Sequence, residues 1–123
     1  MLLDDIADYL ESQGIGTVGV DLFKGDTPEI PDNCVTIERY AGQSPGMLGY
    51  EKPGLQVRVR NKIRENAEIK IKSIETLLHC LCNTTLSGTR YLSIFAQQSP
   101  TPLGRDESNR FDLVQNYIIT KER

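Results

Sequence analysis

The chain has 123 residues, of which 38% are hydrophobic and 25% are charged. This composition is typical of a water-soluble globular protein, and the length suffices for a single core. No apolar run approaches the roughly 20 residues that a membrane-spanning helix needs. The formal net charge of -3 argues against general binding to nucleic acid. We therefore expect one domain over residues 1–123, without a membrane partner.

Three cysteines, Cys34, Cys80 and Cys82, form an odd number without the spacing of a disulfide framework. They predict free thiols, in a protein made in a reducing cytosol. The N-terminal segment carries aspartates where a secretory signal would carry lysine or arginine, so we expect it to remain in the folded protein.

The first half of the sequence predicts one helix followed by three strands. Leucine, isoleucine and alanine recur at helical spacing over residues 2–10, opposite acidic residues, and the helix should stop at residues 14–16. Residues 17–22 alternate as a half-buried strand through Val18, Val20 and Leu22. A turn-rich segment, 24–33, then leads to a strand over residues 34–40. Residues 55–60 give the clearest alternation in the chain and predict the third strand.

The second half predicts a longer helix and two closing strands. An apolar stripe that includes Ala67, Ile71, Ile74 and Leu78 indicates a helix over about residues 66–82. Residues 89–97 and 111–122 then alternate as strands. The predicted order is α-β-β-β-α-β-β. The fold class is therefore α+β, with one mostly antiparallel sheet and two helices packed on it.

Two loops rich in proline and glycine are the candidate contact segments. The loop at 42–54 carries Met47, Leu48 and Tyr50, which are large apolar groups that usually need a partner on a loop. The loop at 99–110 contains two prolines and Gly104, and it is expected to lie outside the core and to present charged groups. We predict interface roles for the charged residues Arg105, Asp106 and Arg110. Asp106 and Arg110 could instead pair with each other and hold the shape of the loop.

The segments PGLQVRVRNK (53–62) and SPTPLGRDESNRFDLVQNY (99–117) resemble the phage and prophage minor capsid proteins of the tail terminator, or tail-completion, group of long-tailed phages. The resemblance covers nearly the whole chain. It implies a structural protein of the virion, without enzymatic activity or cofactor, that caps the tail tube and provides the surface for head-tail joining.

The resemblance also implies the partners. By the family's pattern, the protein forms a ring of copies of itself, taken to be a hexamer, at the head-proximal end of the tail. It would contact the tail tube protein and the head-tail connector protein, and DNA would pass through the ring without specific binding. Assembly would take place in the cytoplasm of the bacterial host. A head-completion or connector protein of the same virion is an alternative, because those folds also form rings.

A search for chemical motifs supports no catalytic or metal site. His79, Cys80 and Cys82 form the only metal-capable cluster, but on a helix the two thiols would point about 200° apart, so buried thiols are expected instead. No spacing supports a serine–histidine nucleophile. Neither nucleotide-binding glycine motif, GxxxxGK[ST] nor GxGxxG, occurs. A nuclease-like site would need carboxylates where residues 54–62 offer arginines.

A basic row runs along the third predicted strand through Arg58, Arg60, Lys62 and Arg64. It could be an outward sheet face that is solvated or paired with an acidic neighbour, or a face that meets the acidic first quarter of another copy. It could also contact nucleic-acid phosphates, with Tyr50 or Tyr91 as a stacking surface, which would make the protein a small nucleic-acid-binding module.

Overall fold

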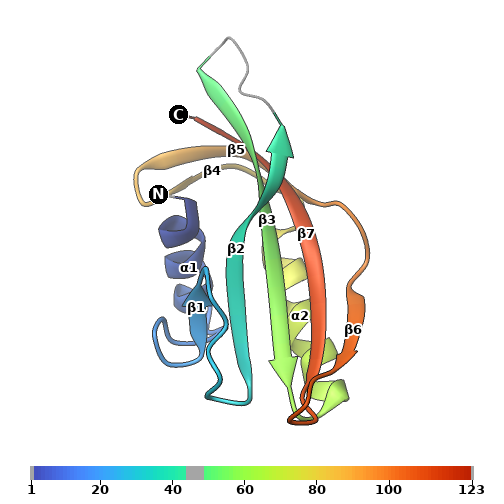
Figure 1. Cartoon of the computed structure of the whole chain (residues 1–123). Coiled ribbons are helices and arrows are strands. Elements are labelled where there is room, and N and C mark those ends of the chain that lie inside the picture. The colour runs from blue at the N-terminus through green and yellow to red at the C-terminus, as the bar shows by residue number, and fades with distance from the viewer. Residues whose placement is uncertain (1, 44–48, 123) are drawn as a thin grey trace.

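The computed structural model describes residues 2–43 and 49–122, which form a mixed α/β fold of two helices and one curled sheet. In chain order the elements are α1 (Leu2–Ser12), β1 (Leu22–Lys24), β2 (Cys34–Gln43), β3 (Tyr50–Asn61), α2 (Arg64–Leu78), β4 (Leu81–Leu86), β5 (Thr89–Ala96), β6 (Thr101–Arg105) and β7 (Phe111–Glu122) (Figure 1). No helix among these residues is long and apolar enough to cross a membrane.

The sheet is mostly antiparallel, as the sequence predicts. Its strands run in the order β1-β2-β3-β7-β5-β4, and β6 pairs with β7 beside this path. Only the short β1 runs parallel to its neighbour, β2. Strand β7 is flanked by β3 along its whole length, while β6 and β5 share its other edge. This arrangement places β7 at the centre of the fold.

The β3–β7 register separates an apolar face of the sheet from a polar one. Val59 lies opposite Leu113, and Leu55 lies opposite Tyr117, and all four side chains are buried. The intervening positions, such as Arg58, point to the other face because side chains alternate along a strand. The alternation that predicts these two strands therefore assigns their faces correctly.

Both helices cover the apolar face of the sheet and contribute to one core (Figure 1). Helix α1 packs against β1, β2 and β4, and α2 packs against β3, β7 and β5. Ile6 and Leu10 of α1 are fully buried, as are Ile74 and Leu78 of α2. The predicted apolar stripes of the two helices are thus core positions.

Helix α1 ends as its glycine predicts. The backbone N–H of Gly14 donates to Glu11 O, the N–H of Ile15 donates to Leu10 O, and Gly14 has a φ of 82°. This is the Schellman arrangement, in which a residue in the left-handed conformation satisfies the last carbonyls of a helix. The turn directs Ile15 back toward the core, where it is buried.

A buried polar pair joins α1 to β5. The hydroxyl of Tyr91 donates to Asp5 Oδ2 over 2.8 Å, and both residues are almost inaccessible. Burial, followed by the bond to the Asp5 carboxylate, raises the pKa of Tyr91 well above its usual value, so its hydroxyl keeps the donated proton. The hydrogen bond from Tyr91 thus gives the buried Asp5 carboxylate a partner. The apolar periodicity of α1 alone would not predict that Asp5 lies in the core.

Two predicted boundaries are wrong, and one strand was not predicted. Residues 17–20 form a turn, in which the N–H groups of Val20, Asp21 and Leu22 all donate to Thr17 O, and the strand begins only at Leu22. Helix α2 ends at Leu78 rather than near residue 82. Cys80 then adopts a φ of 66°, which stops the helix and starts β4. Strand β4 was missed because Leu81 continues the helical spacing of the stripe.

The segment at 99–110, expected to be a loop, contains strand β6. Pro102 lies opposite Leu113 on β7, and the register shifts between Pro102 and Gly104. Prolines are tolerated on an edge strand because the missing N–H can face solvent. The observed order is therefore α-β-β-β-α-β-β-β-β, with two more strands than the sequence predicts.

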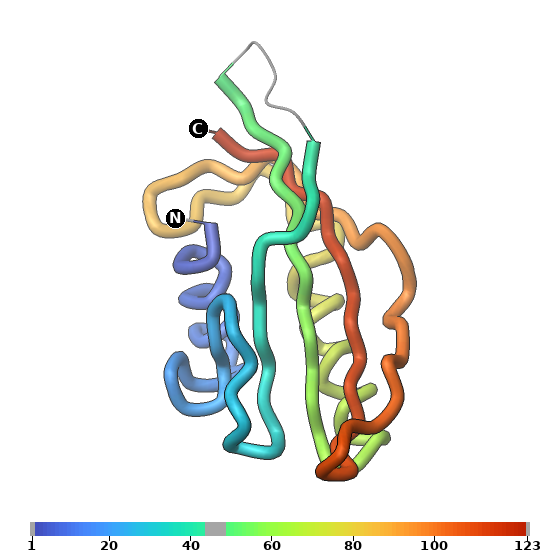
Figure 2. The backbone as a smooth tube through the Cα atoms, viewed as in Figure 1, coloured from blue at the N-terminus to red at the C-terminus, as the bar shows by residue number. Residues whose placement is uncertain are grey.

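Strand β2 makes a sharp step before its end, which Figure 2 shows in the upper part of the strand. The register to β3 shifts between Arg39 and Gly42, and Ala41 has a φ of 53°. A Cβ atom on Gly54 of β3 would lie 1.8 Å from Tyr40 O, so only glycine fits at this crossing. Beyond the step, β2 and β3 continue as an arm (residues 40–43 and 49–52) that extends past the rest of the sheet (Figure 1).

We predict that Ile74→Ala lowers the free energy of unfolding by about 2–5 kcal/mol, because it leaves a cavity in the core beneath α2. Ile69→Ala on the same helix is the matched control, since Ile69 is 59% exposed, and it should cost less than about 0.5 kcal/mol. Urea denaturation of both variants measures the difference. Equal losses would show that the buried face of α2 is assigned incorrectly.

Candidate functional site

The basic row of β3 and the start of α2 is paired within the chain. Arg58 donates to Asp112 Oδ2 over 3.2 Å, and Lys62 lies 3.2 Å from Asp32 Oδ2. Arg64 lies 3.7 Å from Glu68 Oε1 and stands over the ring of Phe111. A nucleic-acid phosphate would have to displace these carboxylates. The row is therefore an internally neutralised surface rather than a line of free cations.

Arg60, the remaining member of the row, is buried. It points to the outward face of the sheet, as the alternation predicts, but the loop at 26–33 folds over it. Its guanidinium donates to the carbonyl oxygens of Pro28, Pro31 and Asp32 at 2.6, 2.8 and 3.1 Å. The expectation that Arg60 is exposed is wrong, because the sequence does not reveal that backbone carbonyls provide its partners.

Arg110, directly before β7, holds the same loop. It donates to the carbonyl oxygen of Glu29, and it lies 3.5 Å from the carboxylates of both Glu29 and Asp32. Its side chain is only 6% exposed, so the expectation that residues 99–110 present Arg110 to a partner is wrong. We call Arg60 and Arg110 together the arginine clamp, since both guanidiniums bind the loop at 26–33.

The turn before β7 is closed by Asp106. Its carboxylate accepts hydrogen bonds from the backbone N–H groups of Ser108 and Arg110, and from Arg110 Nε at 2.8 Å. The bond from the Arg110 N–H, and then the guanidinium, lower the pKa of Asp106. Arg105 donates to the carbonyl oxygens of Lys62 and Asn109. The alternative in which Asp106 and Arg110 pair with each other is therefore confirmed.

The arm beyond the step in β2 carries the other expected contact residues. Tyr50 begins β3 and is half-buried, whereas Met47 and Leu48 lie outside the described residues. Arg39, at the base of the arm, and Lys52, on it, make no hydrogen bond or ion pair with other described residues. The arm thus differs from the basic row, whose charges are neutralised.

The three cysteines do not form a site. Cys34 is buried in β2, and this burial raises the pKa of its thiol. Cys80 and Cys82 are exposed; Cys80 directly precedes β4 and Cys82 lies in it, so the expectation of buried thiols on a helix is wrong. No group of three or more His, Cys, Asp or Glu side chains within the described residues could hold a metal ion.

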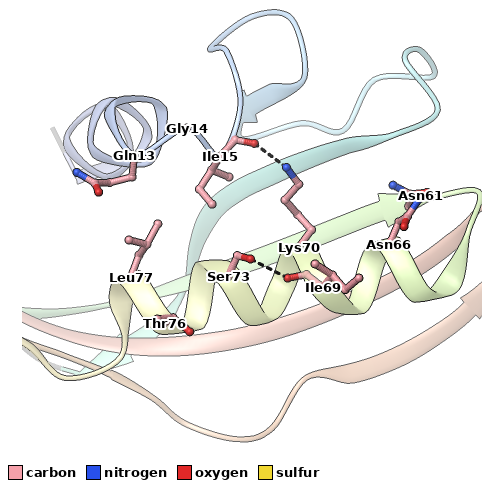
Figure 3. Close-up of a pocket in the computed structure, with 10 residues that line it drawn as sticks. All are labelled: Gln13, Gly14, Ile15, Asn61, Asn66, Ile69, Lys70, Ser73, Thr76 and Leu77. Atoms are coloured by element: carbon pink, nitrogen blue, oxygen red, sulfur yellow. Dashed lines mark hydrogen bonds between the residues drawn. The ribbon is translucent and has the colours of Figure 1, made fainter.

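A groove of about 610 Å³ lies between the end of α1 and the outer side of α2 (Figure 3). Ile15, Ile69 and Leu77 supply its apolar lining, and Lys70 Nζ donates to Ile15 O over 2.9 Å at one side. We call it the α1–α2 groove. The sequence search did not find it, because it depends on how the turn after α1 approaches α2.

The loop at 26–33 presents a second apolar feature that the search missed. Ile30 is 78% exposed and Val20, on the preceding turn, is 61% exposed; the two line one shallow hollow with Phe23. The sequence offers one sign of this exposed apolar side chain: an isoleucine directly before a proline in a turn-rich segment. The described residues therefore offer apolar contact surfaces on both sides of the sheet.

These features define a small mixed α/β protein with one curled sheet and internally paired arginines. Residues 9–123 match the family model for the bacteriophage tail terminator protein, so the chain belongs to that family. It is a structural tail protein of a phage-type virion. The family stated by resemblance is thereby confirmed.

Solved structures share the fold at low sequence identity. A chain from the virion of a native gene transfer agent particle has a TM-score of 0.67 and 10% identity, over 85% of this chain and 81% of that one. A second solved chain, whose name describes no function, has a TM-score of 0.54 and 13% identity, over 96% and 89% of the two chains. No curated protein of similar sequence was found.

We predict that Arg60→Met lowers the free energy of unfolding by about 2–4 kcal/mol, because it leaves partly buried carbonyl oxygens of the loop without donors. Arg39→Met is the control, since Arg39 is exposed and unpaired among the described residues, and it should cost less than about 0.5 kcal/mol. Chemical denaturation compares the two. A similar small loss in both would mean that the clamp adds no stability.

The lowered pKa of Asp106 predicts a pH dependence of stability. A depressed folded-state pKa stabilises the protein above the unfolded value of about 3.9, and this contribution disappears as the pH falls through the folded-state pKa. Asp106→Asn should therefore be less stable than the wild type at pH 7, with a gap that narrows by pH 3. Glu107→Gln, which removes an exposed neighbouring carboxylate, should show no such narrowing. A constant gap for Asp106→Asn would contradict the assignment.

Proposed function

We propose that the protein is a tail terminator that closes the head-proximal end of the tail tube as a ring of identical copies, hexameric by the family's pattern. The observation that carries this proposal is the family match over residues 9–123. The ring stops tube growth and presents a joining surface to the head-tail connector protein. The protein works by association in the virion, without catalysis or a cofactor.

The distribution of side chains supports an assembly role. The buried and half-buried arginines are committed to partners inside the chain, and the exposed apolar side chains lie on separate surfaces. A ring needs two different contact surfaces on each copy, because each copy contacts one neighbour through one surface and the other neighbour through the second. Among the predicted interface residues, Tyr50 has an accessible side chain, and Arg58 and Arg105 stay partly accessible beside their internal hydrogen bonds, so all three remain candidates for contacts with the tube or the connector.

The internal pairing of the basic row supports passage of DNA without specific binding. Phosphate binding depends on cations that are free to neutralise phosphates and so displace the counterions of DNA, and Arg58 and Lys62 already have carboxylate partners. The nucleic-acid-binding alternative therefore gains no support from the placement of these residues. Fluorescence anisotropy with duplex DNA tests this point: strong binding that falls steeply with salt would favour the alternative.

The ring proposal predicts a closed oligomer and a length limit on tail tubes. Light scattering of the purified protein, alone and with the tail tube protein, should reveal a discrete multiple of the 13.8 kDa chain. Electron microscopy should show that adding the protein to growing tubes arrests elongation and leaves one tube end closed to further tube subunits. Tubes that elongate equally with and without the protein would contradict the proposal.

A further inference from the structure

The arginine clamp holds a loop whose tip is apolar and exposed. Two buried guanidiniums bind the carbonyl oxygens of Pro28, Glu29, Pro31 and Asp32. Ile30 lies in the middle of this set and is 78% exposed, the most exposed large hydrophobic side chain of the described residues. The loop is therefore fixed in position on both sides of a side chain that packs on little of its own chain.

Such an arrangement favours binding, because a fixed loop loses little conformational entropy when it docks. Apolar anchors on preorganised backbone contribute strongly to protein interfaces. Val20 and Phe23 adjoin Ile30 around a shallow hollow, so the anchor belongs to a patch rather than standing alone. We call Ile30 and the flanking Glu29 the loop tip.

The α1–α2 groove has the complementary properties. Its lining includes Ile15, Ile69 and Leu77, and its volume of about 610 Å³ exceeds that of a single isoleucine side chain. Lys70 lies at its side, and the only hydrogen bond of its ammonium group within the described chain goes to the carbonyl oxygen of Ile15. The groove thus offers apolar contact beside a cation that has no carboxylate partner among the described residues.

The charges of the two surfaces are opposite. The Glu29 side chain is 91% exposed, and its carboxylate approaches Arg110 only to 3.5 Å. We propose that the loop tip of one copy docks in the α1–α2 groove of a second copy, with Ile30 between Ile69 and Leu77 and with Glu29 facing Lys70. This proposal rests on the proposed function, since it identifies the surfaces through which the ring closes.

The positions of the surfaces fit a ring rather than a two-fold dimer. The clamp holds the loop against the outward face of the sheet, whereas the groove lies on the side that the helices cover (Figures 1 and 3). A contact between two different surfaces is heterologous, so each copy keeps one free surface of each kind and can bind a further copy. Repetition of the contact closes a ring when the rotation between copies permits it.

The first test is Ile30→Asp in the full-length chain, with Leu103→Asp on β6 as the matched control. Leu103 is also a largely exposed aliphatic side chain, at 54%. At the lowest concentration where the wild type is fully oligomeric by light scattering, Ile30→Asp should have the monomer mass and Leu103→Asp the wild-type mass. Both variants should keep the wild-type Tm within about 2 °C, because surface substitutions change stability little.

The second test is a charge exchange. Glu29→Lys and Lys70→Glu should each raise the concentration needed for assembly at least tenfold, and the double variant should restore most of that loss. Lys70→Gln retains an N–H donor for Ile15 O and should behave like Lys70→Glu if the charge matters for assembly. Additive losses without rescue would overturn the pairing of these two residues.

Disulfide trapping identifies the occupant. In a Cys80→Ser, Cys82→Ser background, mixing an Ile30→Cys variant with an Ile69→Cys variant should give a mixed dimer under mild oxidation. Preferential Ile30→Cys homodimers would indicate a two-fold contact and overturn the proposal. If Ile30→Asp forms normal rings but fails to cap tubes, the loop tip binds the tube protein instead, and the proposal is wrong while the proposed function stands. A wild type that forms no closed oligomer, alone or on tubes, would refute the proposed function itself.

Discussion

The antiparallel pairing of β3 with β7 is the constraint on which the rest of the structure depends. Its register runs from Tyr50 opposite Glu122 to Asn61 opposite Phe111, so one ladder spans the length of the sheet. It gives the helices one apolar face to cover. It also brings Arg60, near the end of β3, and Arg110, just before β7, to the same end of the sheet. Without this register the two guanidiniums could not bind the same loop.

The sequence predicts best the elements whose burial follows a simple period. Strand β7 was predicted with the observed bounds, because Leu113, Tyr117 and Ile119 alternate with less buried positions and prolines precede the strand. Strand β4 was hidden, because its first apolar residue continues the spacing of α2 and the helix ends through the backbone conformation of Cys80. Strand β6 was hidden by its prolines. These errors concern edge strands, whose short ladders leave little periodic signal.

The partners of the arginines in the candidate site could be predicted from the sequence only in part. An arginine at an outward position of a strand indicates an exposed cation, and this holds for Arg58, which is half-exposed. It fails for Arg60 because its partners are carbonyl oxygens of a loop about thirty residues earlier, and carbonyls are present in every sequence. The pairing of Asp106 with Arg110 was an open alternative, because four residues of a turn bring them together. Long-range hydrogen bonds to the backbone leave no residue-specific pattern.

The energetics of the arginine clamp relate the fold to the proposed assembly. Burial of a guanidinium is unfavourable unless its N–H groups are hydrogen-bonded. Apolar residues at the same positions often stabilise a protein as much as a buried ion pair does. A clamp of two arginines is therefore better explained by the position it gives the loop than by the stability it adds. In the ring that we propose, the same loop contact would recur at every subunit boundary, so any disorder of the loop would cost entropy at each one. Because Glu29 and Ile30 are already held in position within the monomer, the conformational entropy of the loop is lost during folding, before two copies meet.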